Sequence, residues 1–245
     1  ADWCKPCKII TPLLERLVIE AEGEIRLAMV DVDANPNLPL RFSVHTIPTV
    51  IAFSQGRRVS EFAGVIPESR IREFIKSILP PQPSDLLAQK GNSLLSQGDV
   101  NGAEEAFLQA LDLNDQHPAS MLGIMKVNIL QGKSAQALQL YRTFPASLEY
   151  NDAEQLVPLM KAMENFQNNK LPKETDLDVA FITAMRLAVR GNIYASIDGI
   201  LDILRQDKKY RKDRAKGVLL GLLELLDPEG EQTRNYRAEL AAILF

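Results

Sequence analysis

The chain has 245 residues, of which 46% are hydrophobic and 24% are charged, and its formal net charge is −4. That length allows two or three compact domains. An acidic balance gives no electrostatic reason to expect nucleic acid as a partner, because nucleic-acid binding normally needs a basic face. No apolar run approaches the roughly 18–20 residues of a membrane-spanning helix, so we expect no membrane partner either.

The chain begins abruptly, with alanine at position 1 and its first motif two residues later. We therefore expect residue 1 to be a cut rather than a native start, so the lack of a basic and then apolar secretion signal carries little weight. Cysteine occurs only at positions 4 and 7. Because a disulfide-stapled secreted scaffold uses more cysteines, spread along its chain, this usage favours a reducing cytoplasm or organelle interior.

Residues 1–79 alternate helix-like and strand-like patterns, which predicts an α/β domain. In the first helix the apolar side chains that share one face are Ile9, Leu13, Leu14, Leu17 and Val18. Gln55-Gly56 is a typical hairpin signal between two strand patterns. Along the chain we expect a helix over 8–21, a buried strand over 25–32, a short helix over 38–42, two strands over 49–53 and 57–62, and a helix over 71–78.

Three prolines within residues 80–83 mark a linker, because proline neither continues a helix nor donates to a strand ladder. Beyond this linker the pattern is helical only. Residues 84–149 repeat with a period of 34 residues, which is typical of tetratricopeptide helix–turn–helix units. The matched pairs are Gly98 with Gly132, Ala103 with Ala137, and Phe107 with Tyr141.

The repeat is good in its first unit and degenerate in its second. In the second unit Phe144 stands in place of Ala110, and no glycine matches Gly91. Residues 150–245 stay helical, and the turn at 191–195 echoes the two repeat turns. We therefore expect a third helix pair within a C-terminal, repeat-like helical region.

The segment Trp3-Cys4-Lys5-Pro6-Cys7 carries the clearest chemistry. Two cysteines with two residues between them, at the start of a helix, can form a disulfide across one turn. Cys4 would sit at the helix N-terminus, where free backbone N–H groups and the helix dipole stabilise a thiolate, the attacking species in disulfide exchange. We therefore predict that Cys4 is the nucleophile and that Cys7 resolves the mixed disulfide. Lys5 adds a positive charge, and Pro6 stiffens the helix start.

A zinc site is the alternative for the same two cysteines, but a four-ligand site needs two further Cys or His ligands. The chain offers only His45 and His117, and His117 lies beyond the linker. We therefore expect no metal and no cofactor, with the Cys4–Cys7 pair as the redox group.

These motifs resemble thioredoxin. The dithiol segment, Asp31-Val32-Asp33-Ala34-Asn35-Pro36, Thr46-Ile47-Pro48-Thr49 and Gly64 follow in thioredoxin's order and spacing. The resemblance implies a thioredoxin-like α/β domain over 1–79 that is truncated at its N-terminus, because the family's first strands precede the dithiol. It also implies a cis proline at Pro48 that packs against the cysteines. The implied substrate-binding residues are Trp3, Lys5, Pro6, Ile47 and Pro48.

The whole chain is similar to the chaperedoxin group, YbbN-type fusions of a thioredoxin domain to an all-α tetratricopeptide-like domain. This resemblance implies a bacterial cytoplasmic co-chaperone that holds unfolded or oxidised client proteins and forms mixed disulfides with them. It also implies transfer of clients to a GroEL-type chaperonin docked through the last helix, which we expect to begin near Pro228. The docking stripe would be Tyr236, Leu240, Ile243 and Leu244.

Other interpretations stay open at this point. Because repeat concavities bind protein segments without any chemistry, the protein could be purely an adapter or holdase with a vestigial dithiol. A secreted disulfide oxidoreductase is the other alternative. Packing onto the preceding helices competes with docking for the terminal stripe. The basic run at 208–212 is interpreted as a solvated turn, with partner binding as its alternative, and the methionines at 121, 125, 160, 163 and 185 as core filling.

Overall fold

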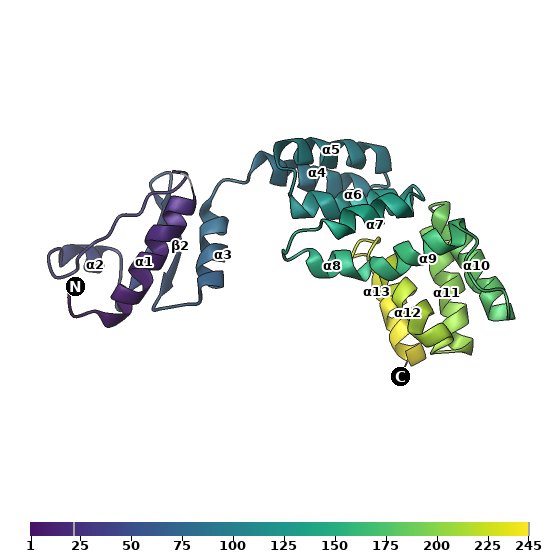
Figure 1. Ribbon diagram of the computed structural model, residues 1–245. Coiled ribbons are helices and arrows are strands. Elements are labelled where there is room, and N and C mark those ends of the chain that lie inside the picture. The colour runs from purple at the N-terminus through teal and green to yellow at the C-terminus, as the bar shows by residue number, and fades with distance from the viewer. Residues whose placement is uncertain (22, 245) are drawn as a thin grey trace. The chain divides into compact units, whose positions relative to one another are not determined.

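The computed structural model describes residues 1–21 and 23–244, and the chain divides into two compact units, Ala1–Pro81 and Gln82–Phe245. The first unit is α/β and the second is helical (Figure 1), as the sequence predicts. No helix in the described part of the chain is long and apolar enough to cross a membrane.

The first unit is built on a helix, a hairpin and a second long helix. Its elements are α1 (Lys5–Glu20), α2 (Asn37–Arg41), β1 (Thr49–Ser54), β2 (Arg57–Ala63) and α3 (Glu68–Ile78). Strands β1 and β2 pair antiparallel through Gln55 and Gly56, whose φ angles are 50° and 76°. Two successive positive φ angles match the right-handed twist of a two-residue hairpin, which confirms the hairpin signal in the sequence.

The core of this unit lies between α1 and α3, where Ile10, Leu14 and Leu17 pack with Ile71. The buried face of α1 differs by one position from the expected one, because Ile10 is buried while Ile9 is 66% exposed. Both Ile9 and Ile10 lie at helical spacing from the apolar residues that follow them, so spacing alone does not decide which of the two is buried.

The predicted strand over 25–32 was wrong. Among the described residues the only sheet is the β1–β2 pair, and 25–32 forms no ladder. Met29 and Val30 are 65% and 51% exposed, although Leu27 contacts the α1–α3 core. A strand needs a hydrogen-bonded neighbour, and an apolar run indicates strand propensity without supplying that neighbour.

The linker ends earlier than the proline pattern indicated. Pro83 is the first residue of α4 (Pro83–Ser96) and so belongs to the helix. Proline suits this position because its φ angle is already helical and the missing N–H would have no partner in the helix.

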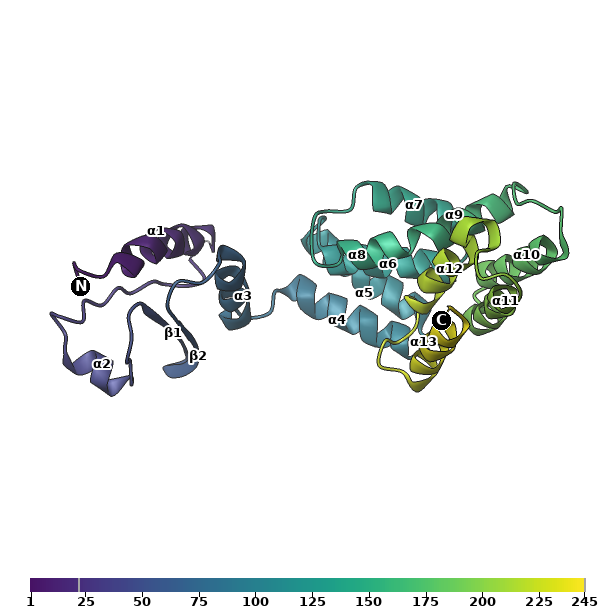
Figure 2. The same ribbon diagram turned by 90° about the horizontal axis from the view of Figure 1, so that it is seen from below.

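The second unit consists of helices that pair in succession. Figure 1 shows α4, α5, α6 and α7 packed together, and each of them contacts the next along the chain; Figure 2 shows α11, α12 and α13 together at the C-terminal end of this unit. Its remaining elements are α5 (Val100–Leu113), α6 (Pro118–Leu130), α7 (Ser134–Arg142), α8 (Tyr150–Gln155), α9 (Val157–Gln167), α10 (Asp176–Val189), α11 (Ile193–Gln206), α12 (Tyr210–Leu223) and α13 (Glu231–Leu244).

Glycines make the turns within the helix pairs. Gly98, Gly132 and Gly191 have φ angles of 81°, 74° and 77° and follow α4, α6 and α10. A left-handed residue after a helix is most readily glycine, which explains the recurrence that the sequence shows. The turn at Gly191 therefore supports the expected third helix pair. The five methionines expected in the core, at 121, 125, 160, 163 and 185, are all buried.

Candidate dithiol site

The two cysteines lie at the start of α1 and form a disulfide. Cys4 is the N-cap residue, Cys7 lies in the first turn, and their Cα atoms are 5.3 Å apart. The backbone N–H of Cys7 donates to Sγ of Cys4 over 3.2 Å. This hydrogen bond means that a helix N–H group already faces the sulfur on which we expect the negative charge in the reduced state.

The charges around Cys4 favour a thiolate at this position. Lys5 and Pro6 are exposed, and the first turn of α1 contains no acidic residue that would offset the positive end of the helix dipole. In the oxidised form Cys4 is only 2% exposed, whereas Cys7 is partly exposed. A partner thiol that attacks the disulfide at Cys4 must therefore first uncover it.

Trp3 ties the dithiol segment to a second motif of the sequence. Its indole is 67% exposed, and its Nε1–H donates to Oδ2 of Asp33 over 2.9 Å. Asp33 is held in turn, because its backbone N–H donates to Oδ1 of Asp31 over 2.9 Å. In the sequence Asp33 is visible only as part of a motif, and its contact with Trp3, 30 residues away, was not predicted.

The remaining predicted substrate-binding residues lie on a separate segment, at the start of β1. The Ile47–Pro48 peptide is cis, as the resemblance implies, and Pro48 is buried. Its carbonyl accepts a hydrogen bond from the backbone N–H of Gly64 over 2.7 Å, which fixes it to the end of β2. In the described part of the chain no hydrogen bond joins Ile47 or Pro48 to the dithiol segment.

Comparison with known proteins shows that the N-terminal part of the chain is similar to thioredoxins. The thioredoxin family model matches residues 1–77. Mitochondrial thioredoxin of Bos taurus is 38% identical over 79 residues, which are 32% of this chain and 48% of that protein, so the chain spans about half the length of this relative. Thioredoxin of Staphylococcus saprophyticus is 39% identical over 79 residues, which are 32% of this chain and 76% of that protein. The chain belongs to the thioredoxin family. A tetratricopeptide-repeat model matches residues 160–245, so this thioredoxin-family chain also carries a tetratricopeptide-type domain.

The helical domain of this thioredoxin-family protein has a groove on α5, α6 and α7. Leu108, Ile124 and Leu140 line it together with polar side chains that include Asn128. Asn128 is only 5% exposed, and within the described residues its side-chain amide has no hydrogen-bond partner. The polar atoms of this amide are not fully buried, so the groove presents one donor group and one acceptor group at its surface.

The predicted docking stripe on α13 contacts the protein itself. Leu240 is buried, and Tyr236, Ile243 and Leu244 are partly buried against the core of the helical domain. The hydroxyl of Tyr236 donates to Oδ1 of Asp198 over 3.0 Å. Burial, followed by this hydrogen bond, raises the pKa of Tyr236 to about 12. The stripe therefore packs onto preceding helices, and α13 begins at Glu231 rather than near Pro228.

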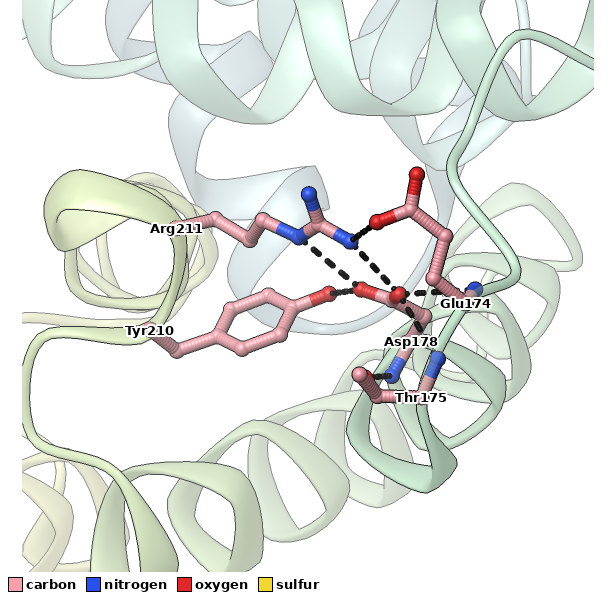
Figure 3. A network of polar contacts seen from close by, with 5 residues as sticks. All are labelled: Glu174, Thr175, Asp178, Tyr210 and Arg211. Carbon is pink, nitrogen blue, oxygen red and sulfur yellow. Dashed lines mark hydrogen bonds and ion pairs between the residues drawn. The ribbon is translucent and has the colours of Figure 1, made fainter.

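The basic run at 208–212 is more than the solvated turn that we expected. Tyr210 is 3% exposed, and its hydroxyl donates to the buried Oδ1 of Asp178 over 2.5 Å (Figure 3). Nη2 of Arg211 donates to Oδ2 of Asp178 and to Oε2 of Glu174, each over 2.7 Å. Arg211 first, and Tyr210 after it, hold the pKa of Asp178 well below its ordinary value in spite of burial. Arg211 and Tyr210 are therefore parts of a polar network between α10 and α12.

Proposed function

We propose that this protein is a redox co-chaperone of the bacterial cytoplasm. In this proposal it exchanges disulfides with unfolded or oxidised client proteins through Cys4 and Cys7 and holds them through its helical domain. The observation that carries the proposal is the position of Cys4 at the N-cap of α1, in a thioredoxin-family domain on the same chain as a tetratricopeptide-type domain.

In the reduced state Cys4 is the nucleophile. Its thiolate, favoured by the α1 N-terminus and the N–H of Cys7, attacks one sulfur of a client disulfide and forms a Cys4–client disulfide, while the other client sulfur leaves as a thiolate. The Cys7 thiolate then attacks Sγ of Cys4, which releases the second client thiolate and restores the Cys4–Cys7 disulfide. The client disulfide gains two electrons, and the two cysteines of this protein lose them.

The helical groove supports the holding role. An extended client segment presents backbone N–H and C=O groups at regular intervals, and Asn128 can satisfy one of each. The neighbouring Leu108, Ile124 and Leu140 suit apolar side chains that an unfolded client exposes. The groove thus fits clients that have lost their own hydrogen-bonded structure.

The exchange of Cys4 for serine tests the catalytic half of the proposal. We expect Cys4→Ser to abolish insulin-disulfide reduction while circular dichroism shows an unchanged helical domain. Cys7→Ser is the matched variant, because it keeps the nucleophile and should trap a covalent client adduct that dithiothreitol releases. Turnover that survives Cys4→Ser would sink the assignment. A wild-type protein that prevents client aggregation but shows no reductase activity would leave the pure adapter as the function.

The chaperonin part of the proposal needs the outer face of α13, since the predicted stripe is packed. Arg234, Arg237, Ala238 and Ala241 are exposed on this helix. We expect Arg237→Glu/Ala241→Glu to weaken association with a GroEL-type chaperonin in a pull-down while the fold and the reductase activity persist. Leu240→Ala is the contrasting variant, because its main effect should be to destabilise the helical domain, in whose core Leu240 is buried. Unchanged pull-down by the Arg237→Glu/Ala241→Glu protein would remove docking through this face.

A further inference from the structure

The start of α12 adopts an unusual backbone conformation. Arg211, Lys212 and Asp213 have φ angles of 48°, 59° and 62°, so three successive residues other than glycine are left-handed. This conformation is unfavourable for L-residues because Cβ crowds the carbonyl oxygen, and it persists only where surrounding contacts hold it. Strained segments of this kind concentrate at ligand-binding sites.

The contacts that hold the turn come from one side only. The guanidinium of Arg211 donates to Asp178 in the first turn of α10 and to Glu174 just before that helix, as Figure 3 shows. Lys212 and Arg214 have no ion-pair partner within the described residues, and both are exposed. Arg211 thus anchors the turn, while the cations that follow it stay available.

A hollow of about 450 Å³ lies between α9 and α12 beside this turn. Its apolar lining includes Pro158, Ala162 and Leu171. Lys212 and Arg214 line it as well, and so does Lys161 of α9, which also has no ion-pair partner in the described part of the chain. One carboxylate, that of Asp213, shares the rim.

The charge of this region opposes that of the rest of the protein. Residues 207–216 contain six lysines or arginines against two aspartates, whereas the whole chain has a net charge of −4. A local cationic surface on an acidic protein attracts anionic groups of a partner, because opposite charges across an interface favour association.

We infer that this hollow is a docking site for an acidic segment of a partner protein, with one apolar side chain against Ala162 and Leu171 and carboxylates at Lys161, Lys212 and Arg214. The apolar lining favours a peptide over a nucleic acid, which would need a longer run of phosphate contacts. The carboxylate of Asp213 at the rim also disfavours a polyanion. This inference concerns the helical domain alone and does not depend on the chemistry of Cys4 and Cys7.

The test uses the full-length protein and a fluorescein-labelled peptide of four glutamates around one leucine, followed by fluorescence anisotropy. We expect saturable binding that weakens as salt rises. Replacement of the peptide's glutamates by glutamines, or of its leucine by serine, should each weaken binding. In Lys212→Glu/Arg214→Glu we expect an affinity loss of about tenfold.

Lys208→Glu/Lys209→Glu is the matched control, since it makes the same charge change in the same basic run outside the hollow. Its affinity should stay within about twofold of the unaltered protein. If circular dichroism shows that the reversed protein is unfolded, Lys212→Gln/Arg214→Gln replaces it with the same expected direction.

Equal loss in the control, or equal binding of the glutamine peptide, would overturn the inference. A labelled single-stranded oligonucleotide is the competing probe. If Lys212→Glu/Arg214→Glu abolishes oligonucleotide binding while the glutamate peptide does not bind at all, the hollow takes polyanions and the inference is wrong.

Discussion

Alanine at Gly123 tests how closely the helices of the first repeat pack around Phe107. Phe107 is completely buried, and its ring lies between two helical glycines. A Cβ atom at Gly123 would lie 2.4 Å from Cζ of Phe107, and one at Gly91 would lie 2.5 Å from Cε1 of the same ring. Neither distance is tolerable, so an added Cβ at either glycine would force the ring of Phe107 or the helix backbone to shift. We therefore expect Gly123→Ala to destabilise the helical domain.

The magnitude follows from two opposing effects. Alanine in a helix is favoured over glycine by about 0.8–1 kcal/mol. Overpacking a filled core costs about 1–3 kcal/mol. Gly123→Ala should therefore lower the free energy of unfolding by up to about 2 kcal/mol. In a Phe107→Leu background the ring is absent, so the same exchange should become neutral or stabilising.

Gly199→Ala in α11 is the matched control. Its Cβ would lie 3.4 Å from Cβ of Ala184, an ordinary contact, so the helical preference of alanine should raise stability by up to about 1 kcal/mol. Urea unfolding followed by far-ultraviolet circular dichroism reports the helical domain. Fluorescence of Trp3, the only tryptophan, reports the thioredoxin domain separately. Stabilisation by Gly123→Ala, or the same loss with and without Phe107, would refute the packing explanation.

Two further predictions concern titratable groups of the helical domain. Asp178→Asn should lower the urea midpoint at neutral pH, because Arg211 loses its buried partner. Since the pKa of Asp178 is depressed from its ordinary value of 3.8, the stability it contributes is present above about pH 4 and is lost as the pH falls further, so the two midpoints should converge in acid. Equal midpoints at neutral pH would contradict the network. In a titration followed by phenolate absorbance, Tyr236→Phe should remove the ionisation step that has a pKa of about 12. If the variant instead lacks a step near the ordinary pKa of 10.0, Tyr236 is not buried against Asp198.

Local signals made most of the fold predictable. Gln55-Gly56 predicts its hairpin because Gly56 tolerates the positive φ angle that the turn needs, and Gly98 and Gly132 predict their turns for the same reason. The strand over 25–32 failed because pairing is not local. Its apolar residues satisfy strand propensity, but a ladder depends on another segment that lies beside them.

The candidate site divides in the same way. Cys4 and Cys7 could be assigned because the chemistry lies within one helical turn and the helix N-terminus is readable from the segment itself. The bond from Trp3 to Asp33 could not, since it joins residues 30 positions apart through a turn that no pattern specifies. The partial burial of the disulfide at Cys4 is likewise a property of the surrounding fold.

The terminal stripe and the basic run show the limit of pattern more sharply, because each has the surface chemistry of a docking site. An apolar stripe on a helix indicates that another surface packs against it, and Leu240 packs into the core of the protein's own helical domain. A basic run indicates attraction to anionic groups, and the anionic groups that pair with Arg211 are Asp178 and Glu174 of the same chain. Both proposed docking surfaces therefore use what the intramolecular contacts leave exposed, namely the outer face of α13 and the cations that follow Arg211.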